Sequence, residues 1–236
     1  MFRLNPALDR AALKTAYARD RRVRIADLLA DEGAAMLHAA LRGRQDWRQI
    51  VNSGGKVFDL DRATRASMSD QQRDALDQAV FAGARDGFQH RYEAIRVPDG
   101  EEERQGSSDI LASFASWLSG GDARDMLRDV TGEDMIAFAD AQATAYAPGD
   151  FLTGHDDAVG GKKRLAAYVF GLTPSWRIEW GGLLLFHGLD GDVATGLAPR
   201  FNTLNVFAVP QLHSVSMVTR AAPSRRYSIT GWLRAR

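Results

Sequence analysis

The sequence predicts an α+β fold in which N-terminal helices pack on a double-stranded β-helix, or jelly roll, of short strands. Two observations support this prediction. Residues 1–134 contain segments whose apolar side chains recur at helical spacing. From residue 135 onward, short apolar runs alternate with Gly, Pro and Asp clusters, as in strands joined by turns. We therefore expect a mainly helical supporting region over 1–134 and a jelly-roll core over 135–236.

The first region carries helix signals and one strand signal. Asn5-Pro6 marks a helix start, and Arg22 to Ala26 alternates like a short strand. The acidic segment Asp99–Ser108 predicts a solvated loop or a flap that faces the substrate. Apolar stripes and capping residues predict helices over Ala34–Leu41, Ser69–Arg85, Ser108–Leu118 and Asp122–Val130.

Short apolar runs predict the strands of the second region. A jelly roll buries the apolar faces of such strands without leaving long open edges. The expected strands are Ile136–Tyr146, Leu165–Leu172, Leu183–Phe186, Leu204–Val209, Val215–Val218 and Tyr227–Leu233.

Composition excludes several classes of function. The 30 basic and 30 acidic residues cancel, so bulk charge does not favour direct binding to nucleic acid or to an anionic membrane. The absence of cysteine excludes disulfides, thiolate metal sites and cysteine nucleophiles. The charged start MFRLNPALDR lacks the apolar stretch of a secretory signal, and no run reaches the roughly 18 apolar residues of a membrane span. We expect a soluble cytoplasmic protein.

His155, Asp157 and His213 form the candidate metal site. His155 and Asp157 lie two positions apart, so on an extended strand both side chains point to the same side. Taken alone, the GHDD segment could be an unoccupied surface loop. His187, with no carboxylate two residues away, is expected in a loop, and His38 and His90 have no ligand spacing.

Two imidazoles and one carboxylate leave one face of a metal open, which suits non-haem Fe(II). Zn²⁺ accepts the same ligands, but the sequence has no His-Glu-x-x-His helix to supply a hydrolytic base. A nearby Arg-x-Ser pair, Arg226 and Ser228, predicts an anion site on one strand face. A separate anion site favours iron with a dicarboxylate co-substrate over zinc.

Five elements in order, YAPGDFLTGHDD, a GG before an apolar strand, LHSV and RRYSITGW among them, extend over residues 135–234. This segment resembles the Fe(II)/2-oxoglutarate dioxygenases of the prolyl 4-hydroxylase type, and especially the ribosomal-protein prolyl hydroxylases and their bacterial relatives. The resemblance implies Fe(II), 2-oxoglutarate and O2, with ascorbate as a reductant. It also implies hydroxylation of a C–H bond, with a prolyl residue of a protein or peptide as the expected substrate.

The resemblance also assigns roles to single residues. Arg226 would hold the distal carboxylate of 2-oxoglutarate and Ser228 would add a hydroxyl, with Arg225 as the fallback because the interval after His213 is longer than usual. Tyr146 would hydrogen-bond the co-substrate, and Arg164 would contact the substrate. Two alternatives stay open: a hydroxylase of a free amino acid or peptide natural product, and a non-catalytic jelly-roll binding module.

Overall fold

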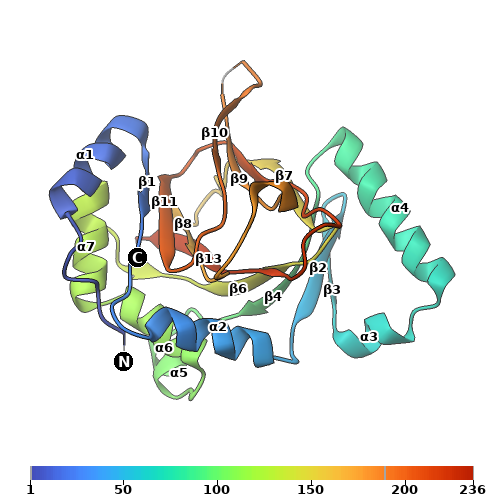
Figure 1. The fold of residues 1–236 in the computed structure, drawn as a ribbon, viewed down its shortest axis with the longest axis horizontal. Coiled ribbons are helices and arrows are strands. Elements are labelled where there is room, and N and C mark those ends of the chain that lie inside the picture. Colours follow the sequence, from blue (N-terminus) through green and yellow to red (C-terminus); the bar gives the residue numbers. More distant parts are fainter. Residues whose placement is uncertain (1, 189, 236) are drawn as a thin grey trace.

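The computed structural model describes residues 2–188 and 190–235, and it confirms an α+β fold built around a curled antiparallel sheet (Figure 1). The helices of the described residues are α1 (Arg10–Asp20), α2 (Gly33–Gly43), α3 (Arg62–Ser67), α4 (Asp70–Asp86), α5 (Glu101–Gln105), α6 (Ile110–Leu118) and α7 (Gly121–Thr131), with one 3-10 turn, η1 (Ile178–Trp180). The strands are β1 (Arg22–Ile25), β2 (Arg48–Ser53), β3 (Lys56–Leu60), β4 (His90–Arg96), β5 (Phe138–Ala139), β6 (Gln142–Tyr146), β7 (Phe151–His155), β8 (Arg164–Gly171), β9 (Leu184–His187), β10 (Val193–Leu197), β11 (Thr203–Ala208), β12 (His213–Val215) and β13 (Arg226–Arg234).

The strands follow the order β1-β11-β8-β13-β6-β4-β7-β12-β9-β10, with β2 paired to β3 and β4 and β5 paired to β13. Strand β4 pairs with both β6 and β7, so it joins the wide sheet around β8 and β13 to the narrower sheet around β7 and β12. The curl between these two sheets gives the jelly roll, and the site described below lies between them.

Helices cover the outer face of the wide sheet. In Figure 1, α1 and α7 lie side by side at one end, and α2, α5 and α6 lie below the sheet. Their apolar side chains meet the sheet in one core; Phe114 of α6, for example, stacks on Phe170 of β8 with ring centroids 5.2 Å apart. Each large apolar side chain buried in this way contributes about 1.5–3 kcal/mol. This packing supports the β8 and β13 wall of the site from behind.

Helices α3 and α4 lie on the opposite side of the molecule, next to the β2–β3 hairpin (Figure 1). Ser69 caps α4 through a reciprocal hydrogen-bond pair with Gln72, as the sequence predicts for a helix that starts here. Val80 of α4 packs with Val51 of β2 and Phe151 of β7 in a small core. The hairpin and α4 therefore brace the strand that ends at His155.

Four expectations need correction. The first helix does not start at Asn5-Pro6, because α1 begins at Arg10 and is capped by the side chain of Asp9. The Asp99–Ser108 segment is not only a loop, because it contains α5, whose buried Arg104 donates hydrogen bonds to the carbonyls of Pro98 and Ala139. The strand expected over Val215–Val218 ends at Val215. His187 closes β9 instead of lying in a loop.

The first 134 residues contribute β1 to β4 as well as helices, and β1 and β4 pair with strands from beyond residue 134. The division of the chain at residue 134 stays a prediction. Within residues 2–188 and 190–235, no single helix is both long enough and apolar enough to cross a membrane.

Candidate metal centre and its pocket

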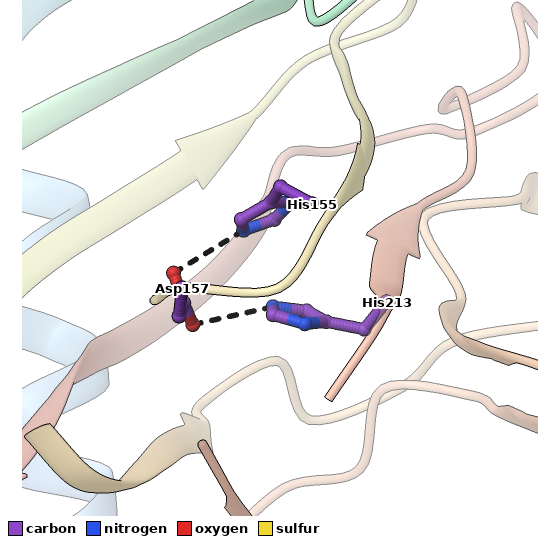
Figure 2. A group of neighbouring side chains, drawn as sticks. All are labelled: His155, Asp157 and His213. Atoms are coloured by element: carbon purple, nitrogen blue, oxygen red, sulfur yellow. Dashed lines mark ion pairs between the residues drawn. The ribbon is translucent and has the colours of Figure 1, made fainter. Parts of the chain in front are cut away.

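Three potential ligands converge at the point where β7 and β12 pair. His213 lies opposite His155 in the antiparallel register, which brings residues far apart in sequence together. His155 Nε2 lies 3.5 Å from Asp157 Oδ1, and His213 Nε2 lies 3.5 Å from Asp157 Oδ2. Figure 2 shows both imidazoles directed at the one carboxylate. One ligand atom from each residue lies within 4.8 Å of the other two, a spacing that could hold a metal ion.

The backbone brings Asp157 to the site by a route other than strand alternation. Strand β7 ends at His155, and Asp157 adopts a left-handed backbone conformation with φ of 63°. Asp tolerates this region better than most residues do. The chain thus turns after His155, and this turn, instead of an extended i, i+2 relation, returns the carboxylate to the imidazoles.

Hydrogen bonds fix the orientation of both imidazoles. His155 Nδ1 lies 3.0 Å from the carbonyl oxygen of Thr153, and His213 Nδ1 lies 2.8 Å from that of Gln211. A carbonyl only accepts, so each Nδ1 carries the proton and each Nε2 presents its lone pair to the site. The donor set therefore fits a divalent metal.

Protonation states also suit metal binding. Burial is the main cause that lowers the pKa of His213 to about 4, with a smaller electrostatic contribution from the nearby His155, and this keeps the His213 imidazole neutral near pH 7. Burial alone would raise the pKa of Asp157, but its contacts with the two histidines outweigh burial and lower it. A neutral imidazole and an ionised carboxylate are the forms that bind metals.

A cavity of about 380 Å³ opens beside this triad. Arg226 lines it and is only 4% exposed, and its Nε has no hydrogen-bond partner among the described residues. The guanidinium lies 5.2 Å from the ring centroid of Tyr146, the residue opposite it in the β6–β13 register. Burial lowers the pKa of Arg226. A buried cation without a paired carboxylate is costly, so an anionic ligand would compensate it.

Gly182 makes room for this arginine. It has φ of 63°, a conformation that favours glycine. A Cβ at this position would lie 3.1 Å from Cδ of Arg226. The GG that precedes β9 therefore has a local structural reason beside the anion pocket.

The neighbours of Arg226 separate as strand alternation predicts. Arg225 points to the other face, where its Nη1 lies 2.5 Å from Oε2 of the buried Glu93. Ser228 shares the face of Arg226 but does not line the cavity; its Oγ lies 2.9 Å from Oγ1 of Thr144, which does.

Arg164 lies at the cavity and also supports the metal site. Its Nη1 donates to the backbone carbonyl of Asp157 at 2.9 Å, and its guanidinium carbon lies 3.4 Å from the ring centroid of Trp232. These contacts hold Arg164 across the turn that positions the Asp157 carboxylate. His187, by contrast, hydrogen-bonds Ser214 at 2.7 Å and is not part of the triad.

Sequence reasoning missed one wall of the cavity. Phe88, His90 and Tyr92 alternate along β4 and its lead-in and line the cavity together. His90 is 7% exposed, and its Nε2 has no partner among the described residues. Burial, with a smaller electrostatic contribution from His155, lowers the pKa of His90 to about 4. The available signal was the i, i+2 spacing of the three aromatic rings.

Comparison with known proteins agrees with this geometry. Residues 141–234 match the model of the 2OG-Fe(II) oxygenase superfamily. The chain is 31% identical over 130 residues to the prolyl 3-hydroxylase OGFOD1 of Xenopus laevis, a match that covers 52% of this chain and 23% of that protein. The chain thus spans about a quarter of the length of this curated relative.

Two solved structures share the fold. A prolyl-4-hydroxylase of Pseudomonas putida has a TM-score of 0.63 at 18% identity, covering 96% of this chain and 99% of that one. A prolyl hydroxylase of Trichoplax adhaerens, solved with a peptide fragment of the hypoxia-inducible factor, has a TM-score of 0.62 at 15% identity, covering 96% and 89%. The predicted resemblance is confirmed, and the superfamily implies Fe(II) and 2-oxoglutarate. The segment that matches the model of the 2OG-Fe(II) oxygenase superfamily, residues 141–234, therefore holds both the triad and Arg226.

Proposed function

We propose that this protein is an Fe(II)- and 2-oxoglutarate-dependent hydroxylase that acts on a prolyl residue of a protein or peptide. One observation carries the proposal: the buried guanidinium of Arg226, whose Nε has no hydrogen-bond partner among the described residues, shares a cavity with the His155, Asp157 and His213 triad. An open metal face and an anion site in one cavity suit a dicarboxylate that also chelates the metal.

The roles of the residues follow from this arrangement. His155, Asp157 and His213 would hold Fe(II), and the guanidinium of Arg226 would bind the distal carboxylate of 2-oxoglutarate. Tyr146 packs against that guanidinium and orients it. Ser228 acts through Thr144, because its hydroxyl contacts Thr144 and not the cavity. When bound, the iron and its co-substrate supply the oxidation of an unactivated C–H bond, while the protein binds, orients and excludes water.

The prolyl substrate is inferred from relatives whose names describe prolyl hydroxylases, at the 3-position in one case and the 4-position in the other. Apolar side chains at the mouth of the cavity are compatible with a pyrrolidine ring. Phe88 and Val159 both line the cavity and are 49% and 50% exposed. Arg164 lines the same cavity, and its Nε has no hydrogen-bond partner within residues 2–188 and 190–235, so it can contact a substrate while Nη1 supports Asp157.

The test combines turnover with an untargeted search. Purified protein with Fe(II), ascorbate and 2-oxoglutarate is expected to form succinate slowly without substrate and faster with it. Peptides from cells with and without the gene are compared by mass spectrometry for proline residues that gain one oxygen. A His213→Ala variant is the matched inactive control. If the wild-type protein forms no succinate under any of these conditions, the proposal fails and the non-catalytic binding module becomes the better account.

Two substrate classes give different results in this experiment. A polypeptide substrate yields a shifted proline in protein digests, whereas a free amino acid or small peptide natural product yields the shift only in the metabolite fraction. Activity confined to the metabolite fraction would contradict a polypeptide substrate and leave the hydroxylase assignment intact.

A further inference from the structure

His90 is a buried polar group that no role assigned above uses. It lies on β4, outside the 141–234 segment that carries the superfamily match. The two residues that flank His90 in the chain are paired: Gln89 with Asn52, and Arg91 with Asp150. His90 lines the cavity, and its imidazole Nε2 is buried and has no partner in the described part of the chain. A buried donor or acceptor left unpaired costs stability, which suggests a ligand at this position.

Ring contacts place His90 along the line between the metal site and the anion site. A row of side chains runs from the metal site to the anion site, with successive ring centroids 5.5 Å apart from His155 to Phe88, from Phe88 to His90, and from His90 to Tyr92. The row continues from Tyr92 to Tyr146 at 5.2 Å, and the Arg226 guanidinium lies 5.2 Å from the Tyr146 ring. His90 thus stands between the metal end and the Arg226 end, nearer the metal end.

Exposure distinguishes a co-substrate contact from a substrate contact. Phe88, at the mouth, is 49% exposed, whereas His90, two positions further along the strand, is 7% exposed. A substrate that enters from solvent meets Phe88 first. A ligand stretched between the triad and Arg226 lies deeper and passes His90.

We infer that Nε2–H of His90 donates a hydrogen bond to the 2-oxo-acid end of 2-oxoglutarate. The inference rests on the proposed function, and it adds a co-substrate contact from the N-terminal half of the chain. The neutral imidazole carries one proton, and with that proton on Nε2 it is a donor. The carboxylate beside the oxo group is an acceptor, and the distal carboxylate is left to Arg226. The contact is to the end of the ligand that meets the metal, so its loss is expected to weaken every 2-oxo acid equally.

The experiment measures binding, not turnover, on the full chain loaded with Mn(II). Dissociation constants are measured by calorimetry for 2-oxoglutarate and for 2-oxobutyrate, which has the same oxo-acid end but no distal carboxylate. His90→Phe removes the donor with little change in ring volume, and His90→Gln restores an amide N–H at similar reach. His38→Phe serves as the matched control, because His38 lies on α2, contacts Phe201 and Tyr227, and does not line the cavity.

His90→Phe is expected to weaken both oxo acids by the same factor, between about 10- and 150-fold, the range for a hydrogen bond to a charged group. The ratio of the two dissociation constants stays as in wild type, His90→Gln recovers part of the loss, and His38→Phe changes neither constant. Arg226→Met gives the opposite pattern, because it weakens 2-oxoglutarate alone.

Two results would overturn the assignment of His90 while leaving the proposed function intact. Both oxo acids could bind His90→Phe within twofold of wild type, which would leave Nε2 to the substrate. Alternatively, His90→Phe could lower Mn(II) affinity or alter the ratio of the two constants, which would show a structural role. If the Mn(II)-loaded wild type binds neither oxo acid, the proposed function itself fails, and this inference with it.

Discussion

Replacing Arg226 by Met tests whether its buried guanidinium is uncompensated in the ligand-free protein and binds an anion. The side chain is 4% exposed, its Nε lacks a partner among the described residues, and burial lowers its pKa. Holding an uncompensated ion in the interior costs several kcal/mol. Met fills a similar volume without charge, so we expect Arg226→Met to raise the free energy of unfolding of the ligand-free protein by about 1–3 kcal/mol, a part of that penalty.

The same substitution is expected to weaken the binding of 2-oxoglutarate. A hydrogen bond to a charged group is worth about 1.5–3 kcal/mol, which corresponds to roughly 10- to 150-fold in affinity. Urea unfolding of the ligand-free protein measures the first effect, and calorimetry with Mn(II)-loaded protein measures the second. Stability and ligand affinity should therefore change in opposite directions.

Arg225→Met is the matched control one residue away. Arg225 pairs with Glu93, which is 2% exposed and also pairs with Arg65. Losing one of two partners of a buried carboxylate should lower stability by about 1–3 kcal/mol without affecting 2-oxoglutarate. If Arg226→Met instead destabilises the ligand-free protein as Arg225→Met does, the guanidinium is already satisfied and the argument is wrong. If Arg225→Met instead loses 2-oxoglutarate binding, the anion is bound by Arg225 and the assignment to Arg226 is wrong.

Three further predictions address the metal site and the core. Mn(II) at 100 times its dissociation constant should stabilise the protein by about 2.7 kcal/mol and raise Tm by roughly 5–10 °C; His213→Ala should remove this shift, and a retained shift would exclude His213 as a ligand. Arg164→Met should weaken the binding of Mn(II) by about 10- to 100-fold, because Arg164 donates a hydrogen bond to the backbone carbonyl of Asp157. If metal titration shows unchanged Mn(II) affinity, Arg164 does not support the metal site, and only its proposed contact with the substrate is left. Burial raises the pKa of Tyr17 from 10.0 to about 12. Ionisation of Tyr17 therefore favours the unfolded chain, and the free energy of unfolding falls as the pH rises from about 10 to about 12. Tyr17→Phe should remove that part of the loss. The prediction would be contradicted if the urea midpoint fell equally steeply between pH 9 and pH 11 in the wild type and in Tyr17→Phe.

The metal triad could be predicted because its signal is local and ordered. His155 and Asp157 are near neighbours, and His213 precedes the Arg-x-Ser strand. The reason assumed for their convergence was nevertheless wrong. Asp157 reaches the site through a left-handed turn, and no hydrophobic pattern predicts a single residue in that conformation.

Strand β4 could not be read from sequence for a different physical reason. Arg91 and Glu93 point away from the cavity, yet both are buried, because each pairs with opposite charges from other elements. A strand with buried charges on one face and His90 and Tyr92 on the other shows no alternation of apolar and polar residues. Arg104 misled in the same way, since its sequence is polar but its side chain is buried on backbone carbonyls.

The placement of β4 explains why the superfamily segment does not make the pocket alone. The triad and Arg226 lie within residues 141–234, but the wall that connects them comes from Phe88, His90 and Tyr92. Strand β4 also pairs with both β6 and β7, so without it two strands that carry site residues would have unpaired edges. The chemistry of the metal is set by one part of the chain, whereas the depth and polarity of the pocket, and hence its selectivity for a ligand, depend on a strand from the other.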